Sequence, residues 1–145
     1  MNEFNWNKMV PELTCSDFKK SLNFYVNVIG FEIVNRRSGP NFAYLNLSDV
    51  QIMIQEFHSS GWNVAELEYP FGRGMNLQIE IDNIDTIHTS LKEKKYPFYR
   101  EMKESWYQVG DHEDGQLEFL VQDPDGYLLR FTKYLGSREL VKEIN

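Results

Sequence analysis

The sequence carries the same pattern of predicted elements twice, first from Met9 and again from Asn76. Each copy begins with residues that alternate between apolar and polar, and continues with apolar residues at the spacing of an amphipathic helix, at 18–29 and at 84–91. Alternation predicts a half-buried strand, and spacings of three and four residues predict a helix. Three further strands are predicted after each helix. Two such βαβββ modules predict an α+β fold, in which a cup-shaped mixed sheet surrounds a central cleft.

Residues that favour caps and turns separate the predicted elements. Ser16 or Asp17 is the expected N-cap of the first helix, and Gly30 is suited to the left-handed residue that ends it. Residues 48–49 and the run 123–126, Asp-Pro-Asp-Gly, predict turns between strands, since proline presets φ and glycine supplies a positive φ. These signals set the order of the strands in both modules.

The chain is expected to form a single domain, residues 1–145, built from modules at 9–58 and 74–134. Two aromatic-rich segments, 59–74 and 103–115, fall outside the repeat and are interpreted as long loops, which often carry function. Residues 137–145 are interpreted as a short exposed extension.

Composition narrows the classes of partner. The net charge of −7 argues against nucleic acid, whose binding depends on Lys and Arg at phosphates. No apolar run approaches the ~20 residues that span a bilayer, and the first residues lack the features of a secretory signal. The single cysteine, Cys15, cannot form an internal disulfide and fits a reducing compartment. We therefore expect a cytoplasmic protein with no membrane contact.

Strand alternation assigns one face of each module to the cup, because every second side chain points to the same side. This face carries amides, carboxylates and aromatic rings where an ordinary core would be aliphatic, since buried unpaired polar groups are costly. We expect a ligand or water in the cup. The residues predicted to contact a ligand there are Glu12, Phe42, Tyr44, Met53, Gln55, Asn76, Gln78, Glu80, Glu118 and Arg130.

Two tryptophans in the predicted loops, Trp62 and Trp106, are added as candidate residues that close over the cup. Each of these interpretations has a simpler alternative. The glutamates and Arg130 can pair with one another across the sheet or face a partner subunit, and Phe42 and Tyr44 can belong to an ordinary core. The loop aromatics can simply pin their loops to the body.

Several motifs together resemble the vicinal oxygen chelate superfamily, which includes glyoxalase I, extradiol dioxygenases, fosfomycin-resistance enzymes and bleomycin-resistance proteins. The motifs are Val10-Pro11-Glu12-Leu13, Asp17, Ser21-Leu22-Asn23-Phe24-Tyr25, Gly30-Phe31 and Asp123-Pro124-Asp125-Gly126. The resemblance spans about residues 9 to 134. It implies paired βαβββ modules, usually assembled as a dimer, with a cup-shaped sheet around each site.

Enzymes of the superfamily usually hold a divalent metal in the cup. The matching ligand positions carry Val10, Asn76 and Arg130, and overlaying the two copies places the fourth at Met53, within one register step. Valine offers no donor, methionine no hard donor, and arginine brings a positive charge. The resemblance therefore implies that the metal is lost, and we expect neither a metal nor another cofactor.

Among the metal-free members, the bleomycin-resistance proteins resemble this chain most. They bind their drug without altering it, at crevices of a dimer interface. Phe42 matches a family aromatic that stacks on the flat bithiazole of the drug, whereas the other stacking tryptophans fall near Gln78 and Asp114. The resemblance thus implies a homodimeric protein that sequesters a planar cationic or aromatic small molecule.

Two alternatives stay open. A metal-dependent lyase, dioxygenase or thiol transferase of the superfamily would need a displaced ligand set, for example Glu12, Glu56, Glu80 or Glu118. A binding protein for an unrelated metabolite would differ from the preferred hypothesis only in its ligand. The histidines share no metal-binding spacing, and neither a nucleotide motif nor a catalytic triad is present.

Overall fold

The computed structural model describes residues 4–140. The first module begins with strand β1 (Glu12–Cys15) and helix α1 (Phe18–Asn23), which continues as the π-helical turn η1 (Phe24–Ile29). Strands β2 (Glu32–Arg37), β3 (Phe42–Leu47) and β4 (Val50–Glu56) complete it. The predicted cap is Asp17, whose carboxylate accepts a hydrogen bond from the amide of Lys20 at 3.1 Å. Gly30, with φ of 111°, ends the helical stretch in the left-handed conformation.

The second module repeats this order. It contains β5 (Asn76–Glu80), α2 (Ile84–Glu93), β6 (Phe98–Val109), β7 (His112–Gln122) and β8 (Leu128–Glu139). Each module forms a four-stranded sheet, ordered β1-β4-β3-β2 and β5-β8-β7-β6, in which the first and last strands are parallel and the other pairs antiparallel. The α+β fold predicted from the repeat is confirmed.

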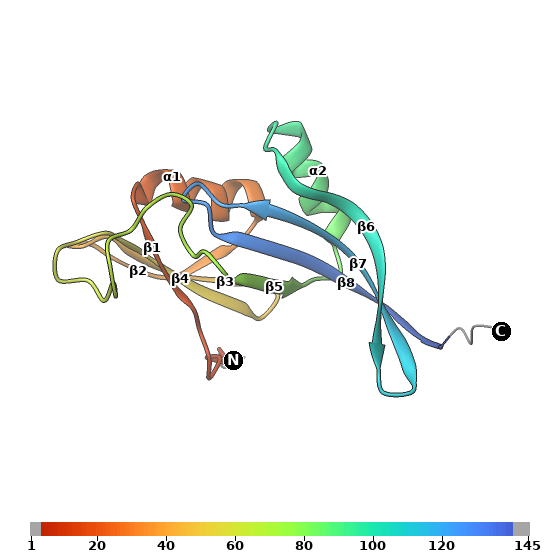
Figure 1. Cartoon of the computed structure of the whole chain (residues 1–145). Helices are drawn as coiled ribbons and strands as arrows, with labels where there is room; N and C mark the ends of the chain where they lie inside the picture. Colours follow the sequence, from red (N-terminus) through yellow and green to blue (C-terminus); the bar gives the residue numbers. More distant parts are fainter. Residues whose placement is uncertain (1–3, 141–145) are drawn as a thin grey trace.

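The helices share one side of the two sheets. In Figure 1, α1 and α2 lie above the strands, while the N-terminal residues and the far end of the β6–β7 hairpin extend below them. The apolar rows of both sheets pack against the helices in one continuous core, which includes Leu45, Ile54, Phe119 and Phe131. The opposite rows are left to form the cup.

The turn at residues 123–126 joins the second module to the first. The buried carboxylate of Asp123 accepts hydrogen bonds from the Tyr25 hydroxyl at 2.6 Å and from the amides of Asp125 and Tyr127. The Asp125 carboxylate accepts hydrogen bonds from the amide and hydroxyl of Ser16. Burial raises the pKa of Asp123 to about 6 and that of Tyr25 well above its ordinary value, so that near pH 7.5 an ionised acceptor faces a protonated donor.

One glycine of this turn is required by its surroundings. Gly126 has φ of +96°, and a Cβ there would lie 2.5 Å from Cβ of Pro70 in the segment that connects the modules. The turn is closed by a hydrogen bond from the Gly126 amide to the carbonyl of Asp123 at 2.9 Å. The predicted turn is present, and the segment that connects the modules packs against its backbone.

The prediction that residues 103–115 form a loop is wrong. These residues continue β6 and β7 as a long hairpin that turns at Gly110 and Asp111, and β8 likewise extends to Glu139, into the predicted tail. In the outer half of β6, residues 103–109, both faces are exposed or half-buried, and the sequence there lacks the apolar alternation that marks a strand. Residues 141–145 of the predicted extension lie outside the described residues.

We expect Tyr25→Phe to lower the free energy of unfolding at pH 7.5 by about 1.5–3 kcal/mol, because it removes a hydrogen bond to a buried charged group. Urea denaturation measures the change. Tyr99→Phe is the matched control, since Tyr99 is exposed and should change stability little. Equal effects of the two substitutions would contradict the role given to the Tyr25–Asp123 contact.

Candidate functional site

The face of each sheet that points away from the helices forms one half of the cup. The neighbouring residues in sequence, such as Leu13, Ala43, Ile52 and Ile79, belong to the core, so alternation turns the predicted ligand residues to the opposite face. We call this face of β1, β3 and β4 the first half-cup: Glu12, Thr14, Phe42, Tyr44, Gln51, Met53 and Gln55. The second half-cup is the same face of β5, β7 and β8: Asn76, Gln78, Glu80, Gln116, Glu118, Leu120, Arg130 and Thr132.

The second half-cup contains an open polar cavity of about 280 Å³. Strand β7 supplies its floor, β5 and β8 one wall, and the β6–β7 hairpin the other. The lining residues are Gln78, Tyr107, Val109, Asp114, Gln116, Glu118 and Arg130. Three of these, Gln78, Glu118 and Arg130, were predicted from the sequence, and the structure brings them together.

Glu118 is the most unusual group in this cavity, because its carboxylate is buried, with 1% of the residue exposed. Tyr107 donates a hydrogen bond to Oε1, and this contact raises the pKa of the Tyr107 hydroxyl. The second oxygen, Oε2, has no hydrogen-bond partner among residues 4–140. A buried carboxylate oxygen without a partner is costly, and such groups are commonly satisfied by water or a ligand.

Two further polar atoms of the cavity have no hydrogen-bond partner in the part of the chain that the structure describes. They are Nε of Arg130 and Oε1 of Gln116, although Nη2 of Arg130 donates to the side-chain oxygen of Gln78. Arg130 forms no ion pair with Glu12, Glu80 or Glu118 within residues 4–140, so the pairing considered from the sequence is absent there. The cavity therefore presents one donor and two acceptors that have no partner among the side chains and backbone of residues 4–140.

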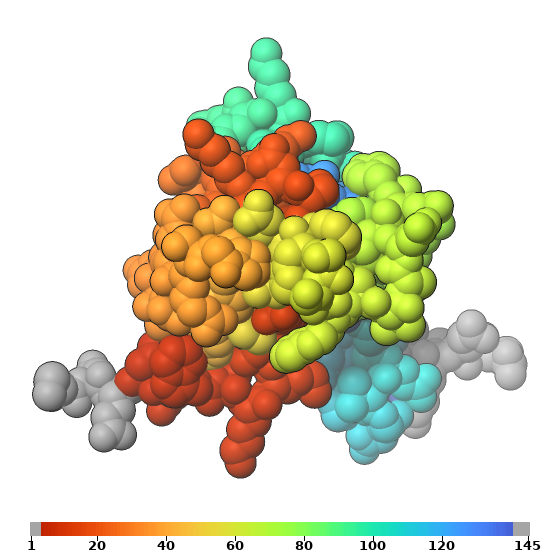
Figure 2. Space-filling model, turned by 90° about the vertical axis from the view of Figure 1, so that its left-hand side faces the viewer, coloured from red at the N-terminus to blue at the C-terminus, as the bar shows by residue number. Residues whose placement is uncertain are grey.

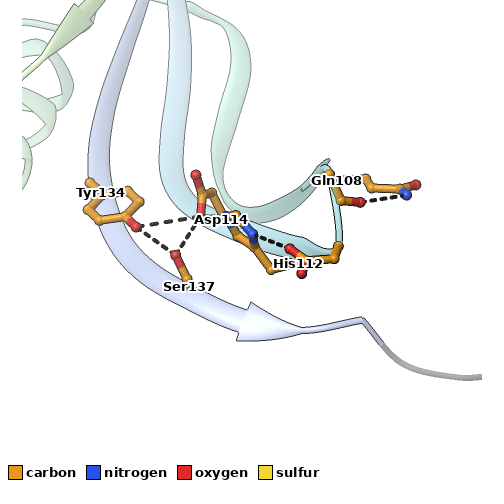
Figure 3. Close-up of polar contacts among 7 residues, drawn as sticks. Gln108, His112, Asp114, Tyr134 and Ser137 are labelled. Carbon is orange, nitrogen blue, oxygen red and sulfur yellow. Dashed lines mark hydrogen bonds and ion pairs between the residues drawn. The ribbon is translucent and has the colours of Figure 1, made fainter.

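A hydrogen-bonded network holds the outer wall of the cavity (Figure 3). Oδ1 of Asp114 accepts a hydrogen bond from Ser137 at 2.6 Å and lies 3.3 Å from Nε2 of His112. Tyr134 also contacts Ser137 through its hydroxyl, at 3.0 Å. These contacts tie β7 to the far end of β8, so that Asp114 is fixed at the rim.

The aromatic residues of the first half-cup are covered by the chain itself. The guanidinium of Arg37 lies 4.0 Å from the centre of the Phe42 ring, and Trp6 packs edge-on against Tyr44 with ring centres 4.8 Å apart. Both predicted residues are buried. Met53 and Gln55 lie opposite Tyr44 and Phe42 in the β3–β4 register and complete this surface.

The remaining predicted residues lie at the edges of the two half-cups. Glu12 is exposed on the edge strand β1, and Asn76 and Glu80 are exposed on the edge strand β5. They share the cup face of their sheets but do not line the cavity of the second half-cup.

The two candidate tryptophans do not reach this cavity. Trp62, in the segment between β4 and β5, is 95% exposed. The prediction that Trp106 lies in a loop was wrong. It lies on β6, where its ring covers Gly115, and the guanidinium carbon of Arg138 lies 3.9 Å from the centre of the ring. Alternation turns its neighbour Tyr107 to the cavity instead. Tyr107 was missed because the hairpin was interpreted as a loop.

The positions that the family resemblance assigns to a metal do not fit one. Val10 offers no donor atom, Met53 offers only a soft thioether, and Arg130 places a guanidinium in the cavity. The divalent cations held by carboxylate and imidazole donors would be repelled by that charge.

The displaced ligand set is not assembled within one chain either. Within residues 4–140, no group of three or more His, Cys, Asp or Glu side chains is placed to hold a metal ion. The carboxylate of Glu56 instead accepts a hydrogen bond from the amide of Asn41 at 3.1 Å.

The paired modules and their cup define a class of fold, and comparison with known proteins identifies the family. The family model described as Glyoxalase/Bleomycin resistance protein/Dioxygenase superfamily matches residues 9–131. The chain therefore belongs to this superfamily, as its motifs predicted.

Individual relatives agree with the assignment. The bleomycin resistance protein of Geobacillus stearothermophilus is 28% identical over 138 residues, covering 88% of this chain and 97% of the relative. TioX from Micromonospora sp. ML1 has a similar fold, with a TM-score of 0.67, 16% identity, and 89% of this chain and all of that chain covered. A glyoxalase/bleomycin resistance protein/dioxygenase from Alicyclobacillus acidocaldarius gives a TM-score of 0.60 and 21% identity, covering 90% and 93%.

We expect Glu118→Gln to raise the free energy of unfolding of the ligand-free protein by about 1 kcal/mol, because an amide is less costly to bury than an unpartnered carboxylate. Chemical denaturation at pH 7.5 measures the change. Glu93→Gln, an exposed substitution on α2 with the same change in charge, should leave stability within about 0.5 kcal/mol. A loss of stability in Glu118→Gln would show that the carboxylate is structural.

Proposed function

We propose that this protein binds a small molecule without a metal and sequesters it, in the manner of the bleomycin-resistance group. The observation that carries the proposal is the buried Glu118 carboxylate with an unpartnered oxygen inside a polar cavity. The resemblance to proteins named for bleomycin resistance supports it. The substitutions at the family's metal positions point the same way, since they remove the donors that its enzymes use.

The charge of the cavity favours a cationic ligand. Glu118 and Asp114 both line it, against the single guanidinium of Arg130, and Glu80 lies near on β5. A ligand N–H that meets Oε2 of Glu118 would form a charge-assisted hydrogen bond, which is about twice as strong as a neutral one. An acceptor on the same ligand would satisfy Nε of Arg130.

A planar part of the ligand would use the first half-cup. Phe42 and Tyr44 offer aromatic faces there, and stacking contributes about 0.5–1.5 kcal/mol for each ring. Arg37 and Trp6 lie on these rings. Stacking on Phe42 therefore requires that Arg37 leave the ring.

We propose a homodimer as the functional unit, in which the first half-cup of one subunit faces the second half-cup of the other. Each four-stranded sheet has edge strands without a partner among residues 4–140, and sheets with unpartnered edges are commonly covered by another chain. The cytoplasm is the proposed compartment, because the lone Cys15 is buried and unpaired. Among residues 4–140, no helix is long and apolar enough to span a bilayer.

Multi-angle light scattering at micromolar concentration should give twice the mass of the 17.2 kDa chain. A two-fold symmetric dimer is expected because the two half-cups of one chain complement those of a second copy. A monomeric mass under these conditions would contradict the proposed assembly, although ligand binding by the second half-cup alone would still be open to test.

Titration with metal-free bleomycin should quench the tryptophan fluorescence of the native protein. The affinity for bleomycin should fall as the salt concentration is raised, because salt screens the attraction between charges. Glu118→Gln should weaken binding by about 10- to 100-fold, the loss expected for one hydrogen bond to a buried charge. Glu93→Gln should bind like the native protein. The absence of binding at micromolar concentration would refute bleomycin as the ligand and favour an unrelated metabolite of similar charge.

A further inference from the structure

The N-terminal segment, residues 4–9, lies against the first half-cup. In Figure 2 these residues, in red, cover the base of the first module on the side where the β6–β7 hairpin, in cyan, also extends. Two hydrogen bonds join the segment to one side chain: the amide of Asn7 donates to Oε1 of Gln51 at 2.9 Å, and Nε2 of Gln51 donates to the carbonyl of Asn5 at 2.6 Å. Gln51 therefore binds the segment as a neighbouring peptide strand would.

Aromatic contacts reinforce these hydrogen bonds. The Trp6 ring packs edge-on against Tyr44 and against Phe4, with ring centres 4.8 and 4.6 Å apart. The Tyr44 hydroxyl donates to Oε1 of Gln51, so the aromatic and amide parts of the surface are coupled. A third hydrogen bond runs from the Asn7 side chain to the carbonyl of Asp49 at 2.8 Å.

The two sides of this contact differ in burial: the half-cup residues are buried, whereas the N-terminal segment is exposed. Tyr44 and Gln51 are 8% and 3% exposed, whereas Trp6 is 59% exposed, and residues 4–9 contribute nothing to the hydrophobic core. The segment can therefore leave without opening the core. What it would uncover is an aromatic ring beside an amide that has lost both of its peptide partners.

We propose that the first half-cup is a recognition site for an extended, tryptophan-containing peptide segment, and that the chain's own residues 4–9 occupy it. The segment acts as an internal competitor, because an outside ligand reaches Tyr44 and Gln51 only after Trp6 has left. This inference goes beyond the proposed function, because it concerns the first half-cup, which lacks Glu118. It does not depend on which small molecule the protein binds.

The first test uses the full chain and limited trypsin digestion. Lys8 lies within the segment and is exposed, and cleavage after it requires the backbone to detach, because a protease needs an extended, unpaired segment. Trp6→Ala should speed cleavage after Lys8 by about tenfold, the change expected for losing aromatic pairs with Phe4 and Tyr44. Trp62→Ala, in an exposed loop, is the control and should leave the rate unchanged. Equal rates in all three proteins would overturn the proposal.

The second test supplies the segment from outside. A capped peptide of residues 4–9 should bind a variant that lacks residues 1–8, with one peptide per chain in calorimetry. Binding should weaken at least about tenfold when Trp6 of the peptide or Gln51 of the protein is replaced by alanine. The full-length protein should bind the peptide far more weakly, because its site is filled. No binding to the folded truncated protein would overturn the proposal.

Two outcomes distinguish this inference from the proposed dimer and from the proposed binding of bleomycin. If removal of residues 1–8 converted a dimer to monomers, the segment would dock on a second copy, and the assignment to its own chain would be wrong. A failure of bleomycin to bind leaves both peptide tests unaffected, since neither uses a small molecule, so the two proposals fail independently.

Discussion

The buried carboxylates of the turn between β7 and β8 hold the two modules in one body. Asp123 accepts hydrogen bonds from Tyr25 of the first module and from the backbone of its own turn, and Asp125 accepts from Ser16. Burying carboxylates is costly unless their oxygens are satisfied, so the arrangement persists only where all these donors meet together. Together with the hydrophobic core that both modules share, this contact holds the sheets in their relative placement, and hence sets the positions of both half-cups.

The two half-cups share a topology and differ in chemistry. The second keeps a polar cavity in which Glu118, Arg130 and Gln116 each have an atom without a protein partner. In the first, the chain itself covers three side chains, through Arg37 on Phe42 and the N-terminal segment on Tyr44 and Gln51. A duplicated scaffold thus presents one surface ready for an outside ligand and one already occupied.

Sequence reasoning succeeded where one face of a strand is buried. Alternation placed Phe42, Gln78, Glu118 and Arg130 on the cup face, because their neighbours were apolar enough to mark the core. It failed in the β6–β7 hairpin, where residues 103–109 of β6 are exposed or half-buried on both faces and their apolar residues do not alternate. Tyr107 was lost and Trp106 misplaced for that reason, and the polar N-terminal residues gave no sign that Trp6 would pack on Tyr44.

By itself, the sequence determined the duplicated βαβββ modules, the superfamily and the residue types at the positions that the family resemblance assigns to a metal, since these follow from local periodicity, turn chemistry and single positions. The tertiary structure decided which of the cup residues meet. Glu118, Arg130, Gln78 and Tyr107 come from four strands, and the atoms of Glu118 and Arg130 that lack a partner within residues 4–140 line one cavity only once those strands pair in register. The hydrogen bonds between the N-terminal segment and Gln51 are likewise long-range contacts, between residues more than forty positions apart, and no local pattern encodes them.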